Sequence, residues 1–123
     1  MNGILILAHG SKRQETEVIL NSLIEKVKVK TGEEHVYPAF LQFSELNLEK
    51  GIKNLVEKGA SCIKIMPMFI FDGVHVTQDI PNELKEIIAK YPQVKIKISG
   101  HIGDDDKLAD IIVDRINSLD YGI

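Results

Sequence analysis

The chain repeats one pattern, in which a short apolar run is followed by a longer stretch with helical periodicity. The apolar runs cover residues 4–8, 36–41, 62–67 and 94–98, and each has the length of a strand. In the stretches that follow, apolar residues recur every three or four positions, as on one face of a helix. These face residues are Leu20, Leu23, Ile24 and Val27; Leu48, Ile52, Leu55 and Val56; Leu84, Ile87, Ile88 and Tyr91; and Leu108, Ile111, Ile112, Ile116 and Leu119. Four alternating units predict an α/β domain with a parallel sheet and helices on both faces.

The ends of the expected helices carry local signals. Gly32 suits the left-handed cap that ends the first helix, and either Ser44 or Asn47 can cap the second. Pro81 fits the first turn of the third helix, and three aspartates at residues 104–106 precede the last one, where the helix dipole favours negative charge. These signals place the helix boundaries close to the limits of the periodic stretches.

Polarity ranks the four strands by their place in the sheet. Pro38 cannot donate a ladder hydrogen bond, so the strand at 36–41 belongs at an edge. The strand at 94–98 alternates with Lys95 and Lys97, so one of its faces is wet and it forms the other edge. Short right-handed connections then favour the strand order 2-1-3-4. Ligands of open α/β sheets gather where the winding reverses, which is here between the first and third strands.

Length and composition are those of a soluble domain, which we interpret as a single unit over residues 1–123. The chain is 44% hydrophobic and 27% charged, and its net charge of −3 argues against a nucleic-acid or anionic-membrane partner. No apolar stretch reaches the length of a membrane span, and the first strand starts too close to Met1 for a signal peptide. Cys62 is the only cysteine and is interpreted as a small core residue, so a reducing cytoplasm is the expected compartment.

Two of the four histidines are expected at the crevice. His9 ends the first strand and His75 follows the third, and the carboxyl ends of both strands lie at one edge of the sheet. Gly10 and Gly73 stand close to them and permit tight turns and close approach of a ligand to the backbone. Two neutral imidazoles suit a borderline divalent cation such as Co²⁺, Fe²⁺, Ni²⁺ or Zn²⁺. Two ligands alone make an open site, which is suited to passing a metal on.

Four other polar residues have weaker claims to function. His35 precedes the second strand and is expected in a solvated turn, whereas His101 follows the fourth strand, at the correct end of the sheet but one strand away. Glu45 and Asp72 can complete a metal's ligand shell or accept protons, or they can be solvated loop charges.

An apolar segment, residues 66–71, is longer than one strand needs. Part of it is expected to pack in the core, and its end can form a wall for a flat hydrophobic ligand. Lys12 and Arg13 lie just beyond His9, where they can pair with ligand carboxylates beside the amino end of the first helix. An apolar wall, a histidine pair and a basic rim together suggest a large acidic macrocycle and a metal.

Two motifs carry a family resemblance that covers nearly the whole chain: LILAHGSK at residues 5–12 and PMFIFDGVHVTQDIP at residues 67–81. They resemble the small CbiX-type sirohydrochlorin cobaltochelatases of the class II chelatase superfamily, which are related to the siroheme ferrochelatases and the nickelochelatases of coenzyme F430. The resemblance implies insertion of Co²⁺ into sirohydrochlorin, a tetrapyrrole with eight carboxylates, in cobalamin biosynthesis. Fe²⁺ for siroheme and Ni²⁺ for F430 are the alternatives. It also implies no organic cofactor, and a homodimer with its cleft between subunits, each resembling half of a two-domain chelatase.

Residue by residue, the resemblance assigns His9 and His75 as the metal ligands and catalytic residues. Many relatives have a glutamate after the second strand, where this chain has Gln42, and Glu45 is a possible substitute. The implied substrate-binding residues are Gly10, Ser11, Lys12, Arg13, Gln42, Glu45, Met68, Phe69, Phe71, Gly73 and Val74. Two pyrrole N–H protons must leave the macrocycle as the metal enters, and one of the histidines is expected to accept a proton.

Three other protein classes fit parts of the pattern. A histidine phosphatase also has His-Gly after its first strand, but it needs an arginine just before the histidine, where this chain has Ala8. A receiver-type signalling domain needs acidic residues after the first strand, and residues 9–11 offer none. A non-catalytic carrier of metal or tetrapyrrole would use the same residues as a chelatase, so turnover beyond one equivalent per site must separate the two.

Overall fold

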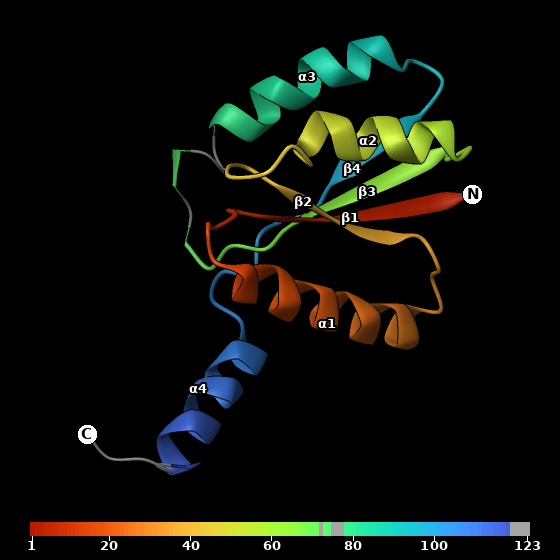
Figure 1. Cartoon of the computed structure of the whole chain (residues 1–123). Coiled ribbons are helices and arrows are strands. Elements are labelled where there is room, and N and C mark those ends of the chain that lie inside the picture. Colours follow the sequence, from red (N-terminus) through yellow and green to blue (C-terminus); the bar gives the residue numbers. More distant parts are fainter. Residues whose placement is uncertain (72, 75–77, 119–123) are drawn as a thin grey trace.

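The computed structural model describes residues 1–71, 73–74 and 78–118, and it is built around one four-stranded parallel sheet (Figure 1). Strands and helices alternate along the chain, as the periodicity predicts. In order, the elements are β1 (Asn2–Ala8), α1 (Gln14–Thr31), β2 (Val36–Phe40), α2 (Leu48–Glu57), β3 (Cys62–Pro67), α3 (Ile80–Lys90), β4 (Lys95–Ile98) and α4 (Asp106–Ser118).

The strand order is β2-β1-β3-β4, which confirms the order expected from polarity. β1 pairs in parallel with β2, Ile4 opposite Val36, and with β3, Gly3 opposite Ile63. Because β1 is central and flanked on both sides, its residues from Leu5 onward are buried on both faces. All four strands end at the same edge of the sheet, the left-hand edge in Figure 1.

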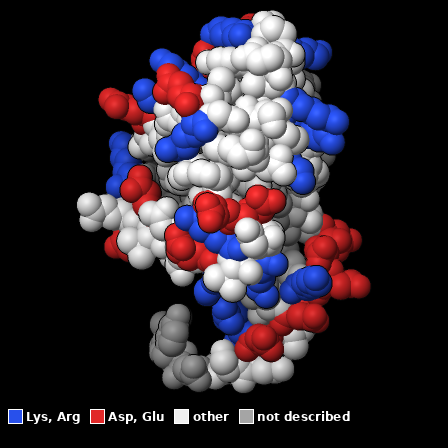
Figure 2. All heavy atoms as spheres, turned by 90° about the vertical axis from the view of Figure 1, so that its right-hand side faces the viewer, with Lys and Arg blue, Asp and Glu red and all other residues white. Residues whose placement is uncertain are grey.

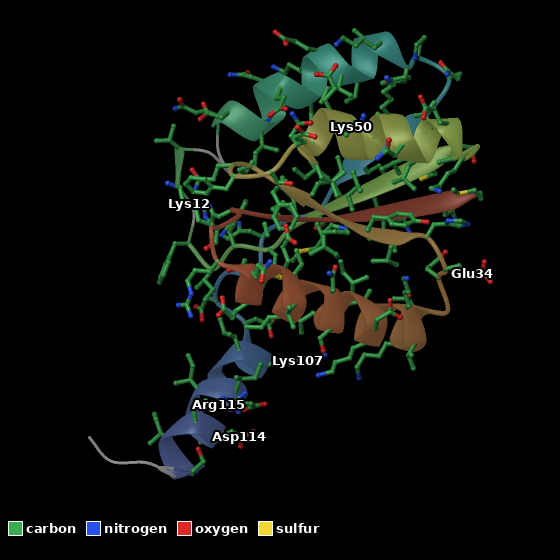
Figure 3. The ribbon with its side chains drawn as sticks, in the orientation of Figure 1. Lys12, Glu34, Lys50, Lys107, Asp114 and Arg115 are labelled. Atoms are coloured by element: carbon green, nitrogen blue, oxygen red, sulfur yellow. The ribbon has the colours of Figure 1, made fainter. Side chains whose placement is uncertain are left out.

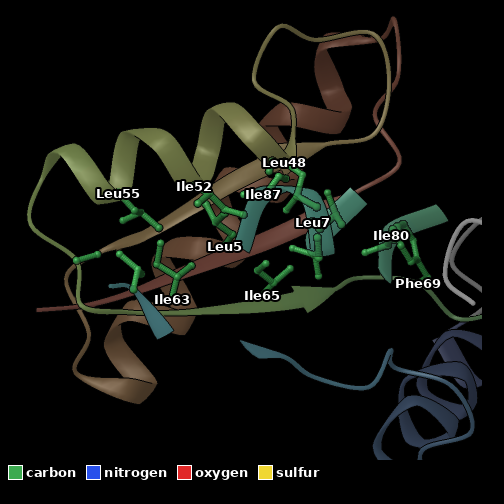
Figure 4. Packing of buried hydrophobic residues seen from close by; sticks show 14 residues of the cluster. Leu5, Leu7, Leu48, Ile52, Leu55, Ile63, Ile65, Phe69, Ile80 and Ile87 are labelled. Atoms are coloured by element: carbon green, nitrogen blue, oxygen red, sulfur yellow. The ribbon is translucent and has the colours of Figure 1, made fainter. Parts of the chain in front are cut away.

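The larger hydrophobic core lies between the sheet and the helices α2 and α3 (Figure 4). Apolar side chains of β1 and β3 point up into this layer and meet those of the two helices. The largest fully buried side chains of this core are Leu5, Leu7, Leu48, Ile52, Leu55, Ile63, Ile65, Ile80 and Ile87. Ile88, expected on the same stripe, is 40% exposed, since α3 buries only the face formed by Ile80, Leu84 and Ile87.

A smaller core lies on the opposite face, where α1 covers β1 and β2. Leu20 and Ile24 are buried against Ile6, Val36 and Phe40. One expected face residue of α1, Leu23, is 40% exposed and lies at the margin of the contact.

The helix signals are mostly where the sequence predicts them. The Asn47 side chain accepts a hydrogen bond from the Lys50 backbone N–H at 2.9 Å, so Asn47 caps α2. Gly32 ends α1 in the left-handed conformation, with φ of 74°. α1 begins at Gln14, directly after Arg13, which has an extended backbone conformation.

The last helix departs from the prediction. Its apolar stripe was expected to pack inward, but no residue of α4 is buried. Ile111, Ile112, Val113 and Ile116 are each about half exposed. The helix extends away from the sheet, beyond α1 (Figure 1). Leu119, the last residue of the expected stripe, lies outside the described residues.

The sheet surface on the α1 side explains why α4 does not dock there. Met66 packs with the α1-side core, so Lys64, two residues earlier on β3, points to the same side. Lys64 pairs with Lys97, and Cys62 pairs with Lys95. All three lysines are exposed. This part of the sheet therefore offers α4 a basic surface where an apolar one is needed.

The outer surface carries interspersed charges of both signs, seen from the amino-terminal end of the sheet in Figure 2. Among the residues that the structure describes, no helix combines the length and apolar character needed to cross a bilayer.

Candidate functional site

His9 lies immediately after the central strand β1, at the edge of the sheet where all strands end. Its side chain is exposed, and its imidazole packs against the ring of Phe69, with centroids 4.3 Å apart and planes inclined at 46°. Within the described part of the chain, no hydrogen bond links the imidazole to another side chain. One face of the ring is therefore supported while its nitrogens remain available.

Phe69 is a rigid support for His9. It is only 3% exposed and belongs to the larger core. The chain on either side is anchored, because the Met68 N–H donates to the Leu7 carbonyl at 2.8 Å. The Phe69 carbonyl accepts a hydrogen bond from the Ile102 N–H at 2.9 Å. Phe69, expected as a wall for the substrate, therefore offers almost no free surface and contacts the imidazole of His9 instead.

The turn after His9 is held by the end of β2. The Gln42 N–H donates to the His9 carbonyl at 3.0 Å, and the Leu41 N–H donates to the Ala8 carbonyl at the same distance. Gly10 has φ of +90° and packs directly against the Gln42 carbonyl. These contacts place the backbone of Gln42 beside that of His9, so Gln42 lies near the site as expected. The side chains of Gln42 and Glu45 are exposed.

A basic rim follows the turn. Ser11, Lys12 and Arg13 line a hollow of about 440 Å³ together with Gln14, Glu17 and Phe43. Lys12 lies at the carboxyl end of the sheet (Figure 3), and its ammonium is 5.3 Å from the centre of the Phe43 ring. Lys12 and Arg13, the two cations expected from the sequence to bind ligand carboxylates, therefore line the same hollow. Phe43 is a member that the sequence pattern did not identify.

The same turn prepares the start of α1. The Ser11 side-chain oxygen accepts a hydrogen bond from the Arg13 N–H at 3.1 Å. The guanidinium of Arg13 lies 3.5 Å from the Glu15 carboxylate, with both side chains largely exposed. Ser11 therefore shapes the backbone of the rim, and Arg13 remains reachable by an anionic ligand.

The apolar segment after β3 divides between core and solvent. Met68 is half-buried against the α1-side core. Phe71 and Val74 are 84% and 62% exposed, and Gly73 is exposed between them. Large apolar side chains in solvent are available for a ligand or a partner.

Several expected positions lie outside the described residues, above all His75 and also Asp72. Among the described residues, no group of three or more histidine, cysteine, aspartate or glutamate side chains is placed to hold a metal ion. His35 lies before β2, at the opposite end of that strand, with its Nδ1 3.2 Å from the Tyr37 hydroxyl. His101 lies in the loop that the Ile102–Phe69 hydrogen bond joins to the site.

The fold and the histidine define the class of protein: a doubly wound α/β domain with an open imidazole at its topological switch point. The chain belongs to the CbiX family, whose sequence model matches residues 3–119. It is 31% identical over 117 residues to a sirohydrochlorin ferrochelatase of Priestia megaterium, covering 95% of this chain and 44% of the relative. It is 35% identical over 118 residues to a sirohydrochlorin cobaltochelatase of Sulfolobus acidocaldarius, covering 94% of this chain and 89% of the relative.

The solved structures confirm the fold. The cobalt complex of the sirohydrochlorin chelatase SirB from Bacillus subtilis subspecies spizizenii superposes with a TM-score of 0.87 at 24% identity. The match covers 96% of this chain and 50% of SirB. The chain thus spans about half the length of the longer relatives and nearly all of the shorter ones.

Proposed function

We propose that residues 1–123 form one chelatase domain that inserts a divalent metal, Co²⁺ first of all, into sirohydrochlorin. The observation that carries the proposal is His9, an exposed imidazole fixed against Phe69 at the carboxyl end of the central strand. The membership of the chain in the CbiX family supports metal insertion as the class of reaction. The family's substrate also matches the basic rim at residues 11–13, since sirohydrochlorin carries eight carboxylates.

The preference for cobalt has its own support. The relative named a cobaltochelatase is 35% identical to this chain, against 31% for the relative named a ferrochelatase. Fe²⁺ insertion for siroheme and Ni²⁺ insertion for coenzyme F430 are the alternatives, because imidazole ligands accept all three metals.

In the proposed mechanism His9 and His75 hold the metal ion above the macrocycle. Two pyrrole N–H protons leave as the four ring nitrogens bind the cation. The metal stays divalent throughout, so the reaction has no redox step. As the metal moves into the ring, a histidine is released and can accept one of these protons as a general base. The tilted contact with Phe69 fixes the direction of the His9 ring, which lowers the cost of aligning the metal with the ring nitrogens.

Gln42 bears on how the metal is held. An amide oxygen is a neutral ligand, so a site with Gln42 in place of glutamate binds a divalent cation less tightly than one with a carboxylate. Weak binding favours release into the macrocycle. Glu45, exposed three residues further along, is the carboxylate that can accept the second proton.

We further propose that the chain works in the cytoplasm as a homodimer. Within the described part of the chain, the apolar side chains of α4 at Ile111, Ile112 and Ile116 stay about half exposed. The resemblance to the small CbiX-type chelatases implies a homodimer with its cleft between subunits. Two domains would also enclose a macrocycle more completely than one.

Anaerobic absorbance of metal-free sirohydrochlorin mixed with Co²⁺, Fe²⁺ or Ni²⁺ tests the reaction directly. We expect turnover beyond one equivalent per site, which a carrier would not give, and the fastest rate with Co²⁺. His9→Ala and His75→Ala should each lower the rate by about 10²- to 10⁴-fold. The matched control is His35→Ala, which removes a histidine at the other end of β2 and should leave the rate unchanged. An unaltered rate in the double variant of His9 and His75 would contradict the proposal.

A further inference from the structure

Phe43 has a backbone conformation that the fold alone does not explain. It is the only non-glycine residue with positive φ in the described part of the chain, at 59°. A side chain with a β-carbon is strained in this left-handed region. Its ring is nevertheless 56% exposed and joins neither hydrophobic core. Phe43 therefore combines a strained backbone with a largely solvent-exposed aromatic ring.

The backbone next to Phe43 is tied to the His9 turn. The Gln42 N–H donates to the His9 carbonyl, and Gly10 packs against the Gln42 carbonyl. Residue 43 follows directly, so its left-handed φ sets the direction in which the ring leaves this fixed layer. The strain thus positions the ring beside the candidate site.

The ring faces a cation. The Lys12 ammonium lies 5.3 Å from the centre of the Phe43 ring, within the range of a cation–π contact. Both residues line the hollow of about 440 Å³ that also holds Arg13. Lys12, Arg13 and Glu17 are the charged residues that line the hollow. Arg13 is also paired with Glu15, whereas Lys12 faces the aromatic ring.

We propose that Phe43 and Lys12 act as one binding element for the carboxylate-bearing rim of the substrate, an inference that rests on the proposed function. The Phe43 ring packs against the apolar edge of one pyrrole ring. The Lys12 ammonium, which lies over the aromatic face, pairs with the carboxylate that this pyrrole carries. Together they select a flat macrocycle with acidic side chains and fix its rotation above His9.

The test measures the affinity of the protein for metal-free sirohydrochlorin by titration under anaerobic conditions. Phe43→Gly removes the ring and permits the same φ, so the melting temperature should stay within about 4 °C of the wild type. Phe43→Gly and Lys12→Met should each weaken binding by about 3- to 12-fold. The double variant should lose less than the product of the two factors, because the residues act as a pair.

The matched control is Lys58→Met, which removes an ammonium 5.8 Å from the Tyr37 ring at the other end of the β2 region. It changes the net charge as Lys12→Met does and should leave the affinity unchanged. If Phe43→Gly lowers the melting temperature strongly, Phe43→Asn replaces it, since asparagine tolerates positive φ. Wild-type affinity in a folded Phe43 variant would overturn the inference and leave the proposed function intact. Failure of the wild type itself to bind sirohydrochlorin would overturn both.

Discussion

The carbonyl oxygen of Gln42 lies 2.1 Å from the position that a β-carbon on Gly10 would occupy. Gly10 also has φ of +90°, a conformation that favours glycine. Both the lack of space for a β-carbon and the positive φ therefore require glycine at residue 10, next to His9. The glycine of the His-Gly pair is explained by this close approach of two backbones at the ends of β1 and β2.

Gly10→Ala should destabilise the protein and displace the His9 turn. A methyl group cannot be accommodated unless the Gln42 backbone moves, and positive φ adds further strain. We expect a loss of about 2–4 kcal/mol in the free energy of unfolding, measured by urea titration.

Two glycines serve as controls for this substitution. Gly59 has φ of +96° but open space around its β-position, so Gly59→Ala should cost only the conformational part, about 1 kcal/mol. Gly100 has open space and no positive φ, so Gly100→Ala should change stability by less than about 0.5 kcal/mol. Equal losses for Gly10→Ala and Gly59→Ala would show that the close contact with Gln42 costs nothing.

Ile112→Glu should abolish self-association. Ile112 is 53% exposed on α4 and would be buried in the proposed homodimer, where an unpaired carboxylate is strongly disfavoured. The wild type should sediment with a mass near twice 13.8 kDa and the variant near 13.8 kDa. The stability of the single domain should change by less than about 0.5 kcal/mol, because the side chain is not buried within it.

Val29→Glu is the matched control for this charge. Val29 is 84% exposed on α1, so the same substitution there should leave the association unchanged. A wild type that sediments as a monomer at all concentrations would refute the role given to α4.

Glu83→Gln should stabilise the protein at neutral pH. Partial burial raises the pKa of Glu83, and the charges of Glu49 and Glu86 raise it further. Glu49 keeps this effect even though it is paired with the Lys90 ammonium. The folded state thus holds this proton more tightly than the unfolded state. Its contribution to stability is fully present below the unfolded pKa and is lost as the pH rises through the folded pKa.

At pH 7 the charged Glu83 therefore costs stability, and Glu83→Gln should recover it. The expected gain is less than about 1 kcal/mol, because the carboxylate is only partly buried and is screened by solvent. Urea titrations at pH 7 and pH 4 should show the gain shrinking at the lower pH. Glu34→Gln, an exposed glutamate before β2, is the control; a gain for Glu83→Gln that is equal at both pH values would contradict the assignment.

The sequence predicted the sheet well because single residues decide strand placement. Pro38 and the lysines of β4 identify the two edges, and the order of the remaining strands follows from short connections. The same reasoning located His9 at the switch point. Such features depend on hydrogen-bonding capacity and polarity, which are properties of each residue type.

Other features depend on the packing of distant segments and were not predicted. The left-handed φ of Phe43 leaves no trace in hydrophobic periodicity. Phe69 was expected at the surface of a cleft, yet it fills the core beneath His9. The periodicity of α4 revealed an apolar stripe. The lysines that make the nearby sheet surface basic, however, come from β3 and β4.

Phe69→Leu should weaken catalysis more than it weakens folding. Leucine keeps the position apolar but removes the ring that contacts the His9 imidazole, so the imidazole loses its fixed orientation. We expect a stability loss of about 1–2 kcal/mol and a fall in the metal-insertion rate of roughly tenfold to a hundredfold. Ile52→Val, a core change on α2, should cost about 1 kcal/mol with no change in rate, which separates the two effects. If the two variants lost stability and rate in the same proportion, Phe69 would be a core residue without a role in positioning His9.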